Sequence, residues 1–274
     1  MSKKCIRWRN RLCSIGLAFG LRLAAREYRK RRSLLDLRGK VVLITVGPQQ
    51  TMTLADYEEA INIMYWGMVY PTLAVLPSMR ARKSGHIINI TSIGGKVSIP
   101  HLLPYCSAKF AALGFSEGLH TEVSKDGLKV VTVVPGLMRT GSYVNAFFKG
   151  QQQTEYTLFG LLATLPFTSI QASRAAHQIV QATRRGETEI ILSIQAQLLA
   201  RFHGLLPGLT TDILTLIDRL LPNGSTEQTS RSKGRTSRNW LSRLLTSLGE
   251  RAAHEYHQYL SREERTLQTP GQAE

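Results

Sequence analysis

Four short apolar runs rich in β-branched residues alternate along the chain with longer segments of helical periodicity. The runs are VVLIT at 41–45, IINIT at 87–91, KVVTVVP at 129–135 and TEIILS at 188–193. Strands of a parallel sheet are buried on both faces and are joined by crossover helices, so this alternation indicates βαβ units. We therefore expect an α/β fold with about four parallel strands, right-handed crossovers and helices on both faces of the sheet.

The segments between these runs carry signals for helix starts and stops. Thr53 and Asp56 have the spacing of a capping box, which begins a predicted helix that runs to about Arg82. Further helices are predicted over about 104–125 and 172–185. The strand and helix order thus supports a sheet covered by helices.

Composition divides the chain into four predicted segments. Residues 1–39 form a basic amphipathic leader helix, and residues 40–222 form the α/β domain. A polar, low-complexity linker covers 223–239, and a C-terminal amphipathic helix and tail cover 240–274. The α/β domain is therefore expected to carry helical extensions at both ends.

The basic charge of the chain is concentrated in its first forty residues. These carry thirteen Lys and Arg against two acidic residues, which is +11 of the formal net charge of +16. The rest is only mildly basic, so we do not expect a nucleic-acid partner. The leader's apolar stretch at 12–21 ends at Arg22, far short of the ~20 residues a membrane span needs. Residues 1–32 either lie on an anionic membrane surface or form a solvated helix packed on the body.

The cysteines of the chain and one long uncharged stretch bear on the compartment in which the protein is expected. Three scattered cysteines and seven scattered histidines predict neither a disulfide framework nor a metal site, and they favour a reducing, cytoplasmic compartment. The stretch at 61–79 has no charged residue but contains Pro71 and Pro77. A helix buried at a subunit or domain contact is the expected reading of this stretch.

A tyrosine and a lysine one helical turn apart form the chemical pattern of the sequence. Tyr105 and Lys109 share a helix face, and the ammonium favours the phenolate and lowers the pKa of the phenol from its usual ~10. Such a pair can give or take a proton at a carbonyl or alcohol oxygen. Ser92 ends a strand at the sheet edge where α/β proteins bind ligands, and its hydroxyl could hold the same oxygen. Thr140 lies at the corresponding edge of the neighbouring strand.

From Lys40 to about Ser193 the sequence resembles the short-chain dehydrogenase/reductase family. The resemblance is carried by ITSIGGKVSIPHLLPYCSAKFAALGFSEGL at 90–119 and VVTVVPGLMRTG at 130–141. It implies a Rossmann-like sheet and NAD(P)-dependent interconversion of small-molecule carbonyls and alcohols. It also implies a homo-oligomer, because members of this family commonly dimerise through the helices equivalent to 61–79 and 105–125.

The resemblance also implies roles for individual residues. Tyr105 would be the acid/base, and Lys109 would lower its pKa and hold the nicotinamide ribose. Ser92 would orient the substrate oxygen. The residues that would border the nicotinamide are Pro135, Gly136 and Thr140.

Two departures from the family pattern bear on activity. In the family, a Gly-rich turn, the first helix, the second and third strands and a fourth strand ending in Asn-Asn-Ala-Gly should follow Thr45, yet Val46 comes directly after it. Two βαβ units need on the order of 60 residues or more, so we interpret the chain as internally deleted. We expect 41–46 to take the place of the lost fourth strand, beside 87–91. The second departure is Met64, where the family often has an Asn that relays protons.

Three functional interpretations remain open from the sequence. The first is an oxidoreductase whose chemical residues are kept and whose grip on NAD(P) is impaired. The second is a non-catalytic remnant that pairs with an intact relative. The third is a lipid-binding or membrane-surface module formed by residues 1–32 and the apolar loop 143–167. The aromatic residues of that loop also suggest a bulky apolar substrate.

Overall fold

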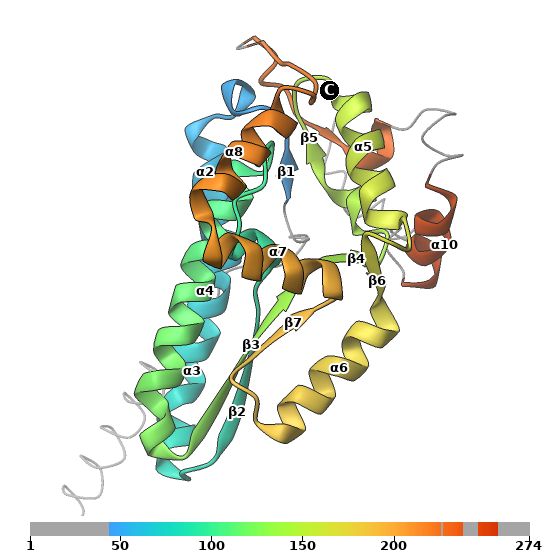
Figure 1. Cartoon of the computed structure of the whole chain (residues 1–274). Coiled ribbons are helices and arrows are strands. Elements are labelled where there is room, and N and C mark those ends of the chain that lie inside the picture. The colour runs from blue at the N-terminus through green and yellow to red at the C-terminus, as the bar shows by residue number, and fades with distance from the viewer. Residues whose placement is uncertain (1–43, 226, 238–245, 257–274) are drawn as a thin grey trace, which may run out of the picture. The chain divides into compact units, whose positions relative to one another are not determined.

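The computed structural model describes residues 44–225, 227–237 and 246–256 (Figure 1). The chain divides into two compact units, Met1–Arg38 and Gly39–Glu274, and every described residue belongs to the second. The predicted leader helix and the first three residues of the run at 41–45 therefore lie outside the described residues.

The main sheet has three parallel strands in the described part of the chain. They are β2 (Gly85–Ile90), β3 (Leu128–Pro135) and β7 (Glu189–Leu192), in the order β2-β3-β7. Each crossover contains a helix, so the predicted α/β class is confirmed (Figure 1).

Helices cover this sheet on both faces. The helix α4 (Leu103–Val123) packs through Leu119 and Val123 against Val130 of β3. On the other face, α6 (Ala172–Arg185) packs Ala175 and Ala182 against β3 and β7; the strand residues of this second cluster are Val131, Val133 and Leu192. Both faces of β3 are thus buried, as its continuous run of apolar residues requires.

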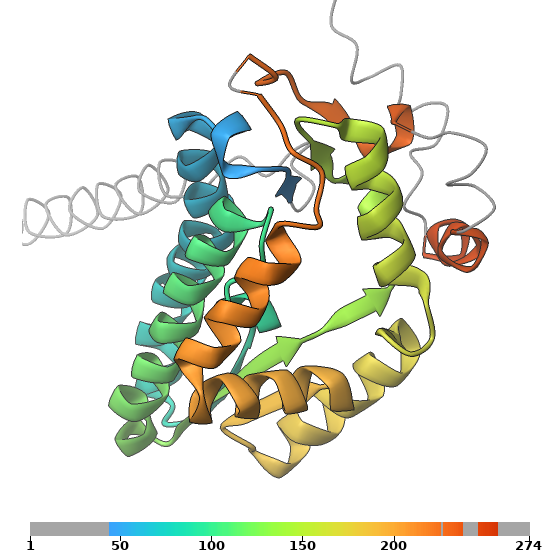
Figure 2. The ribbon, with the colours of Figure 1, turned by 45° about the horizontal axis from the view of Figure 1, so that its top comes forward.

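A long helical segment runs beside α4 (Figures 1 and 2). It consists of α2 (Leu54–Ile61), a π-helical turn η2 (Asn62–Trp66) and α3 (Gly67–Ala81). The predicted capping box is present, because the Thr53 N–H donates to the Asp56 carboxylate at 2.7 Å. The helical segment therefore begins and ends where the sequence predicts.

The apolar character of this segment does not make it a membrane span. Pro71 and Pro77 lie inside α3, while Val69, Thr72 and Leu76 are its buried residues. Among the described residues, no helix has the length and apolar character that crossing a bilayer requires. Few residues of 61–79 are buried in the described chain, so the structure does not bury this stretch on most sides, and its place at a subunit contact stays a prediction.

The position expected for the strand at 41–46 is wrong for the residues that the structure describes. β1 (Thr45–Val46) pairs in parallel with β5 (Phe147–Phe148) and not with β2. Val46 is 3% exposed and packs with Phe148, Tyr143 and Tyr156, so this aromatic cluster buries it better than the edge of β2 would. Among the described residues, the main sheet accordingly has three strands, where the sequence predicted about four.

The region after β3 is more regular than the sequence suggested. β4 (Leu137–Arg139) pairs in parallel with β6 (Ser169–Gln171), and α5 (Gln152–Thr164) lies between them in the chain. The aromatic loop 143–167 is therefore largely a helix and a short strand. Its aromatic side chains fill the cluster around Val46.

The C-terminal part adds helices and one short strand. The helices α7 (Ile194–Leu205) and α8 (Pro207–Asp218) contact each other (Figure 2). Residues Ser232–Lys233 of the predicted linker form β8, antiparallel to β5, and α10 (Ser247–Glu255) is the described part of the predicted tail helix. Short 3₁₀ helices lie at Gln49–Thr51, Ile93–Gly95, Ser124–Asp126, Ser142–Asn145 and Gly234–Thr236.

Candidate active site

Ser92 lies directly after β2, at the carboxyl end of the main sheet. Its side chain is 7% exposed, and its Oγ accepts a hydrogen bond from the Gly94 N–H at 3.1 Å. Tyr105 lies close enough to this hydroxyl for Ser92 to act to lower the pKa of the phenol. The turn Ile93–Gly95 thus fixes the Ser92 hydroxyl in a position to share an oxygen ligand with the phenol.

Tyr105 lies in the first turn of α4, where its ring is half-buried. A Cβ added to Gly94 would lie 3.0 Å from the Tyr105 Cε1 atom, so a glycine is needed for the loop to pass this close to the ring. Burial raises the pKa of Tyr105 to about 12, although the Ser92 hydroxyl acts in the opposite direction. Tyr105 is therefore protonated at neutral pH.

Lys109 lies one turn further along α4 and is 9% exposed. Its Nζ donates to the Ile90 carbonyl oxygen at 3.2 Å and lies 5.9 Å from the centroid of the Tyr105 ring. Burial lowers the pKa of Lys109 to about 8, because the charged form is poorly solvated there. The structure thus brings Ser92, Tyr105 and Lys109 together at one end of β2.

The pKa of Tyr105 differs from the sequence-based expectation. Proximity of Lys109 predicted a lowered pKa for the phenol, but desolvation of the ring raises it, and the group that acts to lower it is Ser92. Lys109 is itself desolvated and is bonded to Ile90. In this arrangement the phenol is a proton donor rather than a ready base.

Pro135 and Gly136 lie at the same edge of the sheet. The Thr91 N–H donates to the Val133 carbonyl at 2.8 Å, which aligns the ends of β2 and β3 and brings the residues after them to one edge. The Gly136 N–H donates to the Leu192 carbonyl at 3.3 Å. These two residues therefore stand where a ligand would bind in an open α/β sheet.

Thr140 follows β4 and belongs to a different local network. Its Oγ1 accepts a hydrogen bond from the Ser142 N–H at 3.2 Å, and its own N–H donates to the Met138 carbonyl at 2.9 Å. The next residue, Gly141, packs against Ala253 of α10. Within the described residues, the contacts given for Thr140 do not join it to Ser92, Tyr105 or Lys109.

A groove runs along the edge of β2 beside Lys109. Its volume is about 470 Å³, and it is lined by η2, α3, β2 and Lys109. Met64 is buried on its floor and clusters with Ala108 and Tyr105, whereas Asn62 is exposed. The apolar Met64 therefore stands beside the phenol at the position where the family often has Asn, and Asn62 does not replace it.

A buried polar chain holds α4 against the sheet, and the sequence analysis missed it. The Asn89 Nδ2 donates to the Ser116 Oγ at 3.0 Å, and the Ser116 Oγ lies 2.7 Å from the Thr132 Oγ1. These hydroxyls and the amide join β2, α4 and β3, so they fix the helix that carries Tyr105. The available signal was a polar residue inside each of two apolar strand runs, IINIT and KVVTVVP.

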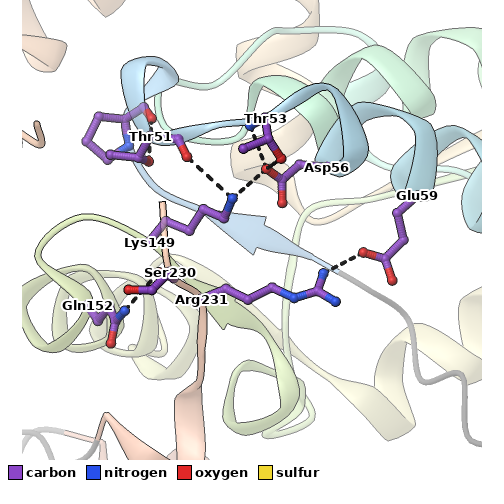
Figure 3. A network of polar contacts seen from close by, with 9 residues as sticks. Thr51, Thr53, Asp56, Glu59, Lys149, Gln152, Ser230 and Arg231 are labelled. Carbon is purple, nitrogen blue, oxygen red and sulfur yellow. Dashed lines mark hydrogen bonds and ion pairs between the residues drawn. The ribbon is translucent and has the colours of Figure 1, made fainter. Parts of the chain in front are cut away.

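A second missed feature is a buried ion pair between α2 and the end of β5 (Figure 3). The Lys149 Nζ lies 2.6 Å from the Asp56 carboxylate and donates to the Thr51 carbonyl at 3.4 Å; the lysine is 3% and the aspartate 4% exposed. Burial disfavours the charged Asp56, but hydrogen bonds from Lys149 and Thr53 outweigh this effect and lower its pKa. No spacing in the sequence indicated this pair, because its members are 93 residues apart.

The predicted linker also contributes contacts near this ion pair. The Arg231 Nη1 lies 2.5 Å from the Glu59 carboxylate, and its guanidinium stacks 4.5 Å from the centroid of the Phe147 ring (Figure 3). The Gln152 Nε2 donates to the Ser230 carbonyl at 3.0 Å. Residues 230–231 are thus attached to α2, β5 and α5.

The residues present fit the nicotinamide half of a dinucleotide better than its pyrophosphate. Lys109 and Tyr105 supply a cation and a hydroxyl at the carboxyl edge of the sheet. Between β1 and α2, however, the chain has one glycine, Gly47, and a short 3₁₀ helix. The carboxylate of Asp56 already occupies the N-terminus of α2, where a helix could otherwise bind an anion.

Comparison with known proteins places this site in a family. The model for short chain dehydrogenases matches residues 39–148. A "Dehydrogenase/reductase SDR family protein 7-like" from Anopheles gambiae is 32% identical over 171 residues, which cover 60% of this chain and 52% of that protein. The "17-beta-hydroxysteroid dehydrogenase 13" of Homo sapiens is 39% identical over 102 residues, covering 35% of this chain and 34% of that protein. The chain spans about half or less of the length of these relatives.

A solved structure agrees with the sequence matches. A short-chain dehydrogenase from Streptomyces avermitilis superposes with a TM-score of 0.51 at 27% identity, covering 65% of this chain and 66% of that one. Residues 39–148 therefore match the short-chain dehydrogenase family in sequence, and the fold that holds the site is that of a short-chain dehydrogenase.

Proposed function

We propose that the chain interconverts a small-molecule carbonyl and its alcohol with an NAD(P) cofactor, and that it binds this cofactor weakly. The observation that carries the proposal is the contact between the Tyr105 hydroxyl and Ser92, with Lys109 one turn away on the same helix. When bound, the nicotinamide supplies or accepts the hydride.

The side chains of the chain supply the proton and the orientation. Tyr105 is protonated at neutral pH, so it can donate its proton to the oxygen of a carbonyl that is being reduced. Ser92 can donate a second hydrogen bond to the same oxygen. Lys109, which bonds the Ile90 carbonyl in this structure, is the candidate to hold the ribose of the cofactor.

Weak cofactor binding follows from the region between β1 and α2. Each charge-assisted hydrogen bond that the chain fails to donate to the pyrophosphate weakens the binding free energy by about 1.5–3 kcal/mol. Two or three such losses lower the affinity by several powers of ten. The Asp56 carboxylate at the N-terminus of α2 adds repulsion for an anion that approaches this helix.

The aromatic residues after β4 do not define a substrate pocket. Tyr143, Phe148 and Tyr156 are buried in the cluster around Val46, so their side chains serve packing. We therefore propose a small-molecule carbonyl or alcohol as the substrate and no longer infer a bulky apolar substrate from these aromatic residues.

Titration of the full chain with NADPH and NADH tests the affinity. Nicotinamide fluorescence should report a dissociation constant in the millimolar range, which corresponds to about −4 kcal/mol. The variant Lys109→Met should weaken the binding further, whereas Lys125→Met, an exchange on the exposed end of the same helical segment, should not. A dissociation constant in the micromolar range would contradict weak cofactor binding.

A second candidate function is pairing with another copy or with an intact relative. The rings of Trp66 and Tyr70 are stacked at 5.2 Å and exposed, and Leu73 on α3 and Phe110 on α4 are exposed as well. Such an apolar surface on two neighbouring helices favours a protein contact. Light scattering should give a dimer mass that falls to the monomer mass in Leu73→Glu but not in Leu54→Glu; equal masses would remove this candidate.

A role at an anionic membrane surface rests on the charge of +11 in the first forty residues. Residues 1–32, which lie outside the described residues, would carry this role. Co-sedimentation with anionic liposomes should decrease when residues 1–32 are removed. Equal pelleting of both forms would dismiss it.

A further inference from the structure

A cavity with both polar and apolar lining residues lies beside α6, and neither Ser92 nor Lys109 lines it. Its volume is about 390 Å³. Its lining residues come from β4, β6, the first turns of α6 and the start of α7, and Figure 1 labels these four elements. The polar side chains that line it include Arg139, Ser169, Gln171, Arg174, Ser193 and Gln195.

Two guanidinium groups face this cavity without a carboxylate. Arg139 comes from β4 and Arg174 from the first turn of α6, and no acidic residue is among the lining residues. In the described part of the chain neither arginine has an ion pair. The Arg139 Nε is buried and has no hydrogen-bond partner.

Other arginines of the described chain do have carboxylate partners. The Arg80 Nε lies 2.7 Å from Asp126, and the Arg231 Nη1 lies 2.5 Å from Glu59. A buried and unsatisfied nitrogen of a charged group costs free energy unless a ligand or ion pairs with it. The absence of a protein partner at Arg139 therefore points to a ligand.

The surroundings of the cavity favour a negative ligand. The helix α6 has 14 residues, and its first turn contains no acidic residue, so its N-terminus adds positive potential. This differs from α2, whose N-terminus is already occupied by Asp56. The guanidinium fork matches the geometry of carboxylate and phosphate oxygens.

We propose that this cavity binds an oxyanion, either a phosphate monoester or a carboxylate, between Arg139 and Arg174. Arg139 supplies the buried Nε, and Arg174 supplies a second guanidinium from α6. The proposal does not depend on the oxidoreductase activity, because it uses none of the residues assigned to that reaction. It gives the chain a ligand site that the family resemblance does not assign.

The test measures binding of inorganic phosphate and of acetate to the purified full chain by calorimetry, at constant ionic strength set with chloride. The variants Arg139→Lys and Arg174→Gln should each lower the affinity for the anion by about tenfold or more, because each removes charge-assisted hydrogen bonds. The matched control is Arg184→Gln, an exposed arginine of the same helix that does not line the cavity.

The two ligands distinguish the two sources of the oxyanion. Binding of phosphate alone supports a phosphate ligand, and binding of acetate alone supports a carboxylate ligand, provided that Arg139→Lys and Arg174→Gln weaken it and Arg184→Gln does not. Arg139→Lys keeps the charge and Arg174 is exposed, so neither exchange should prevent folding. Absence of binding by both anions, or equal weakening by all three variants, would overturn the proposal.

Discussion

At the scale of single residues, burial governs the two groups that define the candidate site. It raises the pKa of Tyr105 to about 12 and lowers the pKa of Lys109 to about 8. Both shifts favour the neutral form. At neutral pH the phenol of Tyr105 is therefore protonated, and the ammonium of Lys109 loses its proton more readily than an ordinary lysine does. Such a pair suits proton donation to a developing alkoxide.

The buried positive charge of Lys109 should lower the free energy of unfolding at neutral pH. The unfolded chain binds this proton more tightly than the folded chain does, so stability rises with pH between about 8 and the ordinary lysine value near 10.5. We expect Lys109→Met to raise the free energy of unfolding at pH 7 by about 1–2 kcal/mol, after allowance for the lost bond to Ile90. Urea unfolding at pH 7 and pH 10 measures this.

The control for this prediction compares, at the two pH values, how much Lys109→Met changes the free energy of unfolding. At pH 10 the folded Lys109 is already neutral, so the advantage of the methionine variant should shrink. An advantage of the same size at both pH values would show that packing, and not the buried charge, is responsible. Lys125→Met should give no change at either pH, since Lys125 is exposed in the 3₁₀ turn Ser124–Asp126 that follows α4.

At the scale of elements, the ion pair between Asp56 and Lys149 joins α2 to the end of β5. Both side chains are buried, so removal of one leaves the other charged and uncompensated. The same aspartate caps α2 through the Thr53 N–H. One carboxylate thus fixes the start of the helix and the attachment of the short sheet β1-β5-β8.

The variant Asp56→Asn should lower the free energy of unfolding by about 3–5 kcal/mol. Glu58→Gln, an exposed exchange of the same type on the same helix, should change it by less than about 0.5 kcal/mol. Because the pKa of Asp56 is lowered, its contribution is present above the ordinary value of 3.8 and is lost as pH falls through the folded value. Equal effects of the two variants in urea unfolding at pH 7 would contradict the role of the pair.

The elements of the main sheet could be predicted from the sequence, and the elements of the small sheet could not. IINIT and KVVTVVP read as buried strands because their apolar residues are continuous, and they form β2 and β3. β1 and β5 have two residues each and are set by the burial of Val46 among aromatic rings that are distant in the chain. Local periodicity carries no information about such contacts.

At the scale of the molecule, the main sheet keeps a free edge at β2. In the described residues β2 pairs only with β3, and Ile88 and Ile90 are 39% and 44% exposed. A strand edge with exposed apolar side chains can pair with other chains and promotes aggregation. This edge is the one beside the groove that contains Lys109.

Ile88→Lys should therefore slow aggregation on heating, because a charge on the edge opposes pairing. Its free energy of unfolding should change by less than about 1 kcal/mol, since the side chain is partly exposed. Ile87→Lys, one residue earlier and buried against α4, should unfold the protein. Light scattering during a thermal ramp measures both, and faster aggregation of Ile88→Lys would argue against an exposed edge.

The same difference of scale explains which parts of the candidate site were predictable. Ser92, Tyr105 and Lys109 come together because a strand end and a helix start are adjacent in any parallel sheet, so their spacing was informative. Thr140 was predicted at the same edge, but its contacts depend on Ser142 and on α10, far along the chain. Arg139 carried no sequence signal, because its lack of a partner is visible only in the folded chain.

The central claim is that Tyr105 donates the proton when a nicotinamide cofactor reduces a carbonyl at this site. The most direct measurement is transfer of deuterium from labelled NADPH, at millimolar concentration, to the alcohol product, followed by mass spectrometry. The full chain should transfer the label across a panel of small carbonyls, and Tyr105→Phe should reduce the rate by about 10²–10⁴-fold while Tyr70→Phe leaves it unchanged. Transfer at equal rates in all three proteins, or no transfer by the full chain, would contradict the claim.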